Sequence, residues 1–235
     1  MRNFGEKSNR AERWGKMMAY IDIDDVCLTL SKQEILKHVT VSFEKENIHG
    51  IIGKNGSGKS MLFKCICGFV KPQKGSITVN GKKIGKDSDF PPNAGIIIES
   101  PGFMPYYSGY KNLKILADLN KKIGREEIYA AMQAVGLDPD SPKHVKKYSL
   151  GMKQRLGIAQ AIMEKPELLI LDEPMNGLDK HAIQDMRELL LKLKGDGKTI
   201  LLTSHNFEDI QLLCDDIYEM DLGNLEQIQK PETVQ

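Results

Sequence analysis

Residues 53–60 constrain the fold of this chain more than any other segment. They read GKNGSGKS and match the pattern GxxxxGK(S/T) at every fixed position. A short apolar run at residues 47–52 precedes them, and a helical pattern begins at Lys59. Glycines let the backbone turn so that successive N–H groups point inward, and a following helix adds its positive end. The sequence therefore predicts a phosphate-binding loop between a strand and a helix of an α/β core.

Two side chains of this loop carry the expected chemistry. Lys59 supplies a positive charge for the β and γ phosphates of a nucleotide, and the Ser60 hydroxyl can ligate Mg²⁺. The residues expected to contact the nucleotide are Gly53, Lys54, Asn55, Gly56, Ser57, Gly58, Lys59, Ser60 and Met61. Kinases, GTPases and transport ATPases share such a loop, so the loop alone does not select a reaction.

Extended and helical segments alternate along the chain. Strand patterns cover residues 20–30, 35–43, 47–52, 94–98, 167–171 and 198–203, and Asn80-Gly81 centres a hairpin at residues 75–84. Helical patterns cover residues 112–121, with Leu113, Leu116 and Leu119 on one face, and residues 125–135 and 181–193. We expect a mobile tail at residues 1–17 and one domain at 18–235, whose α/β core (18–98 and 155–235) is interrupted by a helical insertion (99–154).

Composition limits the partners. The 235 residues include 33 basic and 32 acidic side chains, and a net charge of +1 gives no global reason to expect nucleic-acid binding. The longest apolar runs are strand-sized, so a membrane role has to go through a partner. The four cysteines lack zinc spacing, and we expect them to be buried thiols.

A second set of polar residues follows two apolar strands. The run LLIL at residues 168–171 ends in Asp172, Glu173 and Pro174. Asp172 is expected to hold Mg²⁺ through its water shell, and Glu173 to orient or deprotonate the attacking water. His205 follows the strand at residues 199–203, where it could bond the γ-phosphate or fix Glu173.

Residues 148–155, YSLGMKQR, resemble the signature motif of ABC-type ATPases, LSGGQ followed by QR. Ser149 is also a good N-cap for the helix that follows. The asparagine-led run NGLD at residues 176–179, which ends in Asp179, resembles the D-loop of that family. The similarity covers about residues 18–225, and the residues that correspond to the signature are Ser149, Leu150, Gly151 and Met152.

This resemblance implies a P-loop NTPase of the ABC type, with a mixed-sheet core, an antiparallel β subdomain and an α-helical insertion. It implies ATP and Mg²⁺ as ligands, and a homodimer in which each signature serves the ATP held by the other subunit. Leu150 and Met152 replace the usual glycine and glutamine, and Glu99 stands where most members carry a glutamine that ligates Mg²⁺. No aromatic residue stands where adenine is usually stacked, which leaves Leu28 and Leu30 as aliphatic surface for the base.

The segments ESPGF (99–103) and SLGMKQ (149–154) resemble the ATPases of bacterial bacitracin-resistance and lantibiotic self-protection exporters. Such ATPases work with a separate integral-membrane permease, which implies a cytoplasmic subunit peripheral to the inner face of the plasma membrane. The stretch 101–110 would then be the docking surface. Its aromatic side chains suit a partner interface or packing within the insertion: Phe103, Tyr106, Tyr107 and Tyr110.

Three other functions compete with a transport ATPase. A soluble ABC protein acting on ribosomes or DNA would carry two cassettes or long coiled coils, and neither is present here. A phosphate-loop kinase has no use for the signature at Ser149. A chain that binds ATP but hydrolyses it poorly, because of Glu99 and the altered signature, stays open.

Overall fold

The computed structural model describes residues 19–99 and 102–229; the predicted N-terminal tail lies outside these ranges. The strands are β1 (Ile21–Leu30), β2 (Gln33–Phe43), β3 (Ile48–Ile52), β4 (Lys74–Val79), β5 (Lys82–Lys83), β6 (Ala94–Ile97), β7 (Leu168–Leu171), β8 (Thr199–Thr203), β9 (Asp216–Asp221) and β10 (Asn224–Ile228). The helices are α2 (Lys59–Ile66), α3 (Gly109–Asn120), α4 (Arg125–Ala134), α5 (Leu150–Ile162), α6 (Lys180–Gly195) and α7 (Phe207–Leu213), with a short 3₁₀ turn at Val145–Lys147. None of the helices in the described ranges is long and apolar enough to cross a membrane.

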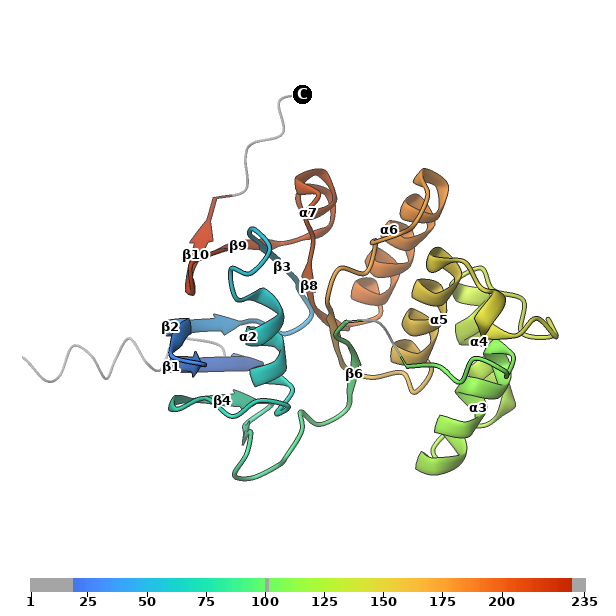
Figure 1. Cartoon of the computed structure of the whole chain (residues 1–235), viewed down its shortest axis with the longest axis horizontal. Helices are drawn as coiled ribbons and strands as arrows, with labels where there is room; N and C mark the ends of the chain where they lie inside the picture. Colours follow the sequence, from blue (N-terminus) through green and yellow to red (C-terminus); the bar gives the residue numbers. More distant parts are fainter. Residues whose placement is uncertain (1–18, 100–101, 230–235) are drawn as a thin grey trace, which may run out of the picture.

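The strands form two sheets. A four-stranded antiparallel sheet has the order β2-β1-β4-β5, and a six-stranded sheet has the order β10-β9-β3-β8-β7-β6. Strands β9, β3, β8, β7 and β6 run parallel, and β10 is antiparallel to β9. The predicted combination of a mixed sheet and an antiparallel subdomain is therefore confirmed (Figure 1).

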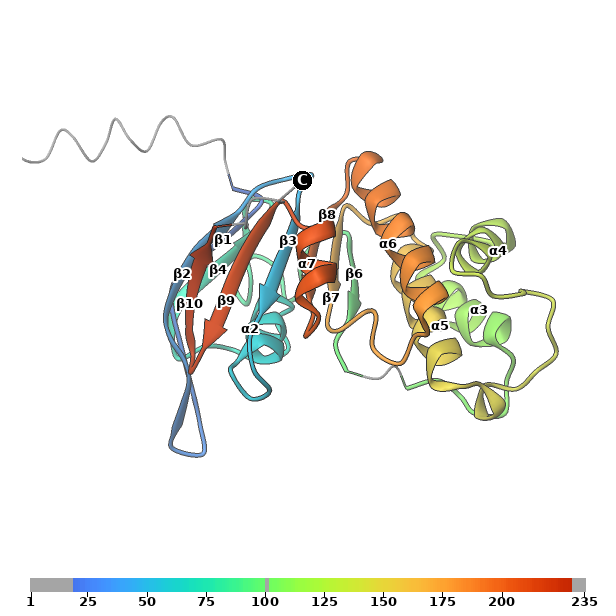
Figure 2. The same cartoon turned by 90° about the horizontal axis from the view of Figure 1, so that it is seen from above.

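Helix α2 lies between the two sheets (Figure 2). The three apolar residues that the sequence places on its inner face, Leu62, Phe63 and Ile66, are fully buried. They pack with the inner faces of β1, β2 and β4 and with β7 and β8 in one hydrophobic cluster. This packing fixes the N-terminus of α2, and so the phosphate loop, against the ends of the parallel strands.

Helices α5, α6 and α7 cover the opposite face of the six-stranded sheet, and α3 and α4 pack outside α5 (Figure 2). Leu113 of α3 is fully buried in this second cluster, but Leu119 is 74% exposed. The predicted apolar face of α3 is therefore wrong at Leu119. That residue lies in the last turn, two residues before the left-handed C-cap at Lys121 and beyond Ala117, the last buried residue of α3.

The contact between β6 and α5 depends on a residue without a side chain. A Cβ atom on Gly95 would lie 2.0 Å from the carbonyl oxygen of Ala161. We expect Gly95→Ala to lower the free energy of unfolding by about 1–3 kcal/mol, the usual cost of overpacking. Gly195→Ala is the matched control, because a Cβ at Gly195, the last residue of α6, meets nothing within 4 Å. Urea denaturation of both variants measures the difference, and equal midpoints would show that α5 shifts at no cost.

Candidate functional site

The phosphate loop connects β3 to α2, and its glycines adopt backbone angles that other residues avoid. The φ angles of Gly53, Gly56 and Gly58 are 146°, 79° and 120°. A Cβ atom on Gly53 would also lie 2.2 Å from the carbonyl oxygen of Met220 on β9. Only glycine fits at this position, because both the conformation and the adjacent strand exclude a side chain.

Lys59 turns back into its own loop. Its Nζ donates hydrogen bonds to the carbonyl oxygens of Gly53 (2.6 Å) and Lys54 (3.1 Å). Burial lowers the pKa of its ammonium group, whereas the nearby carboxylates of Glu173 and Asp172 act in the opposite direction. The loop is therefore held around a buried cation, which suits it to phosphate oxygens.

Parallel strands bring the acidic residues to this loop. Asp172 follows β7, and its Oδ2 accepts a hydrogen bond from Ser60 Oγ at 2.6 Å, while its Oδ1 accepts one from Thr203 Oγ1 at 2.7 Å. The hydroxyl of Ser60 and the carboxylate of Asp172 form an all-oxygen donor set, which fits Mg²⁺. The structure thus brings together these two residues, which are 112 positions apart in the sequence.

Glu173 and His205 also meet. His205 Nε2 lies 2.9 Å from Glu173 Oε1, with 50% and 23% of the two side chains exposed. Glu173 has a φ of 51°, so the chain turns sharply where it leaves β7. Burial raises the pKa of the Glu173 carboxyl, and the charges of His205 and Lys59 partly offset this effect. A carboxylate with a raised pKa beside a histidine is a suitable base for a water molecule.

Glu99 lies beside Lys64 of α2. Its Oε1 lies 2.5 Å from Nζ of Lys64, one turn along α2 from Ser60, and its side chain is 67% exposed. The structure therefore brings Glu99 to the helix that carries the phosphate loop. No motif in the sequence marks Lys64 for this contact.

The signature residues line a second surface. Ser149 is the N-cap of α5, where its Oγ accepts a hydrogen bond from the Met152 amide at 3.2 Å, as predicted. Asp179 caps α6 in the same way, through the Ala182 amide at 2.9 Å. These two helix N-termini border one cavity of 560 Å³, which is also lined by Leu150, Gly151, Met152 and Gly177. Helix N-termini attract anions.

The signature helix is tied to the acidic residues. Nε2 of Gln154 on α5 donates to the carbonyl oxygens of Glu173 and Pro174, both at 3.1 Å. A movement of α5 therefore acts directly on the segment that positions Glu173.

One sequence-based expectation about a surface is wrong, and the two alternatives left open for another each apply to part of it. Leu28 is 1% exposed and faces the core, so of the two leucines only Leu30, at 41%, offers surface for a base. In the aromatic stretch, Phe103 and Tyr110 pack against the hydrophobic cluster of α3–α6, whereas Tyr106 is 66% exposed. Packing within the insertion thus accounts for part of the stretch, and Tyr106 projects outward.

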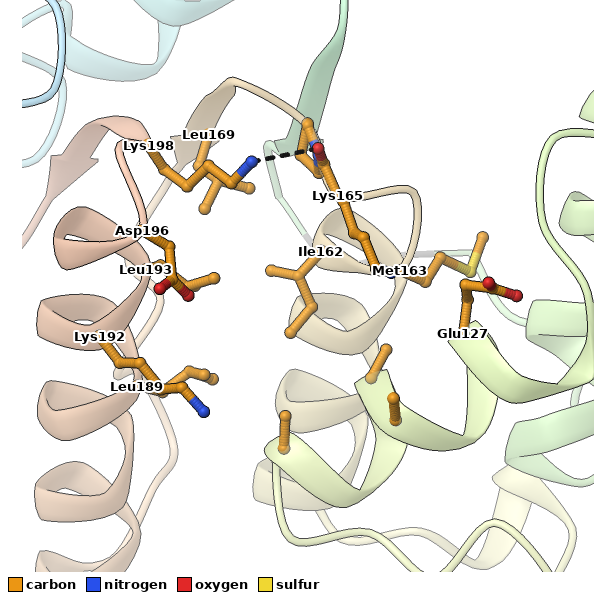
Figure 3. Close-up of a pocket in the computed structure, with 14 residues that line it drawn as sticks. Glu127, Ile162, Met163, Lys165, Leu169, Leu189, Lys192, Leu193, Asp196 and Lys198 are labelled. Atoms are coloured by element: carbon orange, nitrogen blue, oxygen red, sulfur yellow. Dashed lines mark hydrogen bonds between the residues drawn. The ribbon is translucent and has the colours of Figure 1, made fainter.

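Two other groups of residues are not suited to the same chemistry. A cavity of 370 Å³ between α4, α5 and α6 has mainly apolar walls, and Glu127 and Asp196 stand among the lysines at its rim (Figure 3). Asp25, Cys27 and His38 gather on β1 and β2. His38 Nδ1 lies 2.6 Å from Asp25 Oδ1, too close for two ligands of one tetrahedral zinc ion, which stand about 3.3 Å apart at bond lengths near 2 Å. Asp25 and His38 form an exposed hydrogen-bonded pair.

A phosphate loop between a parallel strand and a helix, with a carboxylate on a nearby parallel strand, defines a P-loop nucleoside triphosphatase. The family model for ABC transporters matches residues 36–176. The chain is 42% identical over 210 residues to the uncharacterised ABC transporter ATP-binding protein YybJ of Bacillus subtilis (strain 168), covering 89% of this chain and 96% of that protein. It is 37% identical over 207 residues to the bacitracin transport ATP-binding protein BcrA of Enterococcus faecalis, covering 87% and 67% of the two chains.

Among solved structures, the fold is similar to the dimeric post-hydrolysis state of the ATP-binding cassette MJ0796 bound to ADP and Pi. The TM-score is 0.79 at 20% sequence identity, covering 89% of this chain and 99% of that one. The chain belongs to the ABC transporter family, as an ATP-binding subunit that hydrolyses ATP for transport.

Proposed function

We propose that two copies of this chain close head-to-tail around two Mg-ATP molecules, and that hydrolysis drives a separate membrane permease. The observation that carries this proposal is the division of the site into two surfaces. One surface, around the phosphate loop, holds a buried cation and oxygen ligands. The other, at the N-termini of α5 and α6, offers anion-binding groups beside a cavity with no phosphate loop of its own.

In this mechanism residues 53–61 bind the phosphates, and Ser60, Asp172 and Glu99 serve the metal ion. Bound Mg²⁺ would neutralise charge on the β and γ phosphate oxygens. Glu173 takes a proton from the attacking water or orients it. His205 holds Glu173 in place on the side that faces the γ-phosphate. Ser149 and Gly151 contact the γ-phosphate of the nucleotide that the partner subunit binds.

We further infer export of an antimicrobial peptide or drug, from the similarity to a bacitracin transport ATPase. The permease would hold the chain at the cytoplasmic face of the plasma membrane. We assign residues 99–154 to the helical subdomain that meets the permease, with Tyr106 exposed on it, and residues 18–98 and 155–235 to the ATPase core.

The test replaces Ser149 by aspartate in a Glu173→Gln background. Aspartate caps a helix as well as serine does, so α5 is preserved, but its charge repels a phosphate. We expect Glu173→Gln with Mg-ATP to elute as a dimer in size-exclusion chromatography, and Ser149→Asp to return it to the monomer. Ser108→Asp is the matched control, because Ser108 caps α3 through an equivalent 3.2 Å hydrogen bond from Lys111.

A dimer that survives Ser149→Asp would overturn the proposed role of the signature. If Ser108→Asp disrupts the dimer equally, the effect of Ser149→Asp does not come from a trans nucleotide. A wild-type chain that hydrolyses ATP as a strict monomer would contradict the head-to-tail mechanism as a whole.

A further inference from the structure

Thr203 is a fully buried polar residue at the end of β8, a strand that is otherwise aliphatic between its two threonines. Its register places it level with Ile51 on β3, just before the phosphate loop. On the other side of β8, Leu202 pairs with Leu171, so Thr203 stands level with the first residues after β7. It therefore lies between the strand that leads to the phosphate loop and the strand that leads to the acids.

The hydroxyl of Thr203 uses both its donor and its acceptor. Oγ1 donates to Asp172 Oδ1 at 2.7 Å and accepts from the backbone amide of Glu173 at 2.8 Å. One atom thus contacts two consecutive residues that have different expected tasks, metal binding and water activation.

Each hydrogen bond has a geometric consequence. The bond to Oδ1 fixes the plane of the Asp172 carboxylate, so that Oδ2 stays at Ser60 Oγ. The bond from the Glu173 amide holds the turn at which Glu173 adopts its left-handed φ of 51°, a conformation that a side chain disfavours. That turn aims the Glu173 side chain toward His205.

We propose that Thr203 is a positioning residue that locks the metal-binding carboxylate of Asp172 and the catalytic carboxylate of Glu173 in one arrangement. The inference rests on the proposed roles of these two acids. A valine of the same shape would leave a buried amide and a buried carboxylate oxygen without the hydroxyl that now serves both.

Thr199, at the other end of β8, shows what a purely structural threonine looks like in this strand. It is also fully buried, and its Oγ1 accepts a hydrogen bond from the Glu46 amide at 2.9 Å. Its hydroxyl touches neither acid. Thr199→Val is therefore a matched control for the loss of a buried hydroxyl from β8.

The experiment compares wild type, Thr203→Val, Thr203→Ser and Thr199→Val by two readouts. The first is the affinity for ATP, measured by calorimetry with Mg²⁺ and with EDTA; the second is steady-state phosphate release. For Thr203→Val we expect affinity in EDTA within about twofold of wild type and a loss of Mg²⁺-dependent tightening of about 10-fold or more. We also expect a kcat about 10–100-fold lower, with a KM for Mg-ATP that rises in step with the lost affinity. Thr203→Ser restores both readouts, and Thr199→Val changes neither.

Equal Mg²⁺-dependent tightening in wild type and Thr203→Val, or a matching loss in Thr199→Val, would overturn the role of Thr203 alone. Absence of any Mg²⁺ effect in wild type would overturn the proposed metal site, and this inference with it. If Thr203→Val does not fold, Thr203→Cys takes its place, because it is close in size and donates only weakly. Failure of Thr203→Ser to restore either readout also contradicts the proposal.

Discussion

Phosphate release by Glu173→Gln is expected to fall by about 10²–10⁴-fold, the usual contribution of a general base. Glutamine has the shape of glutamate but cannot accept a proton from water. The carboxyl group it replaces is only 23% exposed and lies beside His205, where burial raises its pKa and makes it a stronger base. Binding of ATP should persist, because the phosphate loop and the Ser60–Asp172 pair are untouched.

The matched control for this prediction is Glu167→Gln. Glu167 immediately precedes the opposite end of β7, where its carboxylate meets Lys45 and the hydroxyl of Tyr20. Its loss should leave the rate unchanged within about twofold. The measurement is single-turnover phosphate release, together with ATP affinity for each variant. A Glu173→Gln rate near that of wild type would mean that another group orients or deprotonates the attacking water.

The alternative that the chain binds ATP but hydrolyses it poorly is tested by the same measurement on the wild type. Glu99 is paired with Lys64, so its negative charge is balanced at the position where the family usually carries a neutral glutamine. This pairing removes one physical reason for slow hydrolysis. Measurable ATP affinity with negligible turnover, even with a permease present, would support the alternative instead.

The phosphate loop and its acids were predictable because their signals are local. The glycines of the loop carry special backbone angles, and an apolar run ending in acids marks a strand that leaves the core. Parallel packing then brings such strand ends to one edge of the sheet, so Ser60, Asp172, Glu173 and His205 converge without further information.

Residues whose role depends on packing between distant elements could not be predicted. Lys64 meets Glu99 only because α2 lies beside the end of β6, and Thr203 meets Asp172 only because β8 lies next to β7. A threonine at the end of an aliphatic strand is a weak signal for a role in the site. Thr199 stands at the other end of the same strand, and its hydroxyl bonds to the Glu46 amide instead. Strands β9 and β10 carry many acids and amides in a half-exposed pattern, so their sequences give only a weak strand signal.

Packing between distant elements also explains why the exposure of Leu119 and Leu28 differs from the expectation. Spacing places Leu119 on the apolar face of a helix, and the resemblance to ABC-type ATPases places Leu28 on a surface available to adenine. The structure exposes the first and buries the second, because α3 is contacted only along part of its length and β1 turns alternate residues inward. Periodicity identifies an element, but the neighbours of that element decide which of its residues are covered.

Asp209→Ala is expected to lower the free energy of unfolding by about 3–5 kcal/mol, as removal of one partner from a buried ion pair usually does. Asp209 on α7 is 2% exposed, and its Oδ1 accepts a hydrogen bond from Nε of Arg187 on α6 at 2.8 Å. The alanine variant leaves the guanidinium, which is only 16% exposed, without its main partner. Urea denaturation followed by circular dichroism measures the loss.

Two further variants separate the ion pair from the general effect of charge on α7. Glu208→Ala removes an acid that is 69% exposed and 3.4 Å from the same guanidinium, and we expect a cost below about 1 kcal/mol. Replacing both partners, Arg187→Met with Asp209→Leu, should recover most of the stability, because no buried charge is left unpaired.

Since α7 begins two residues after His205, a double variant with wild-type stability but reduced phosphate release would show that the ion pair also holds His205 in place. Equal losses in Asp209→Ala and Glu208→Ala would contradict the importance of burial.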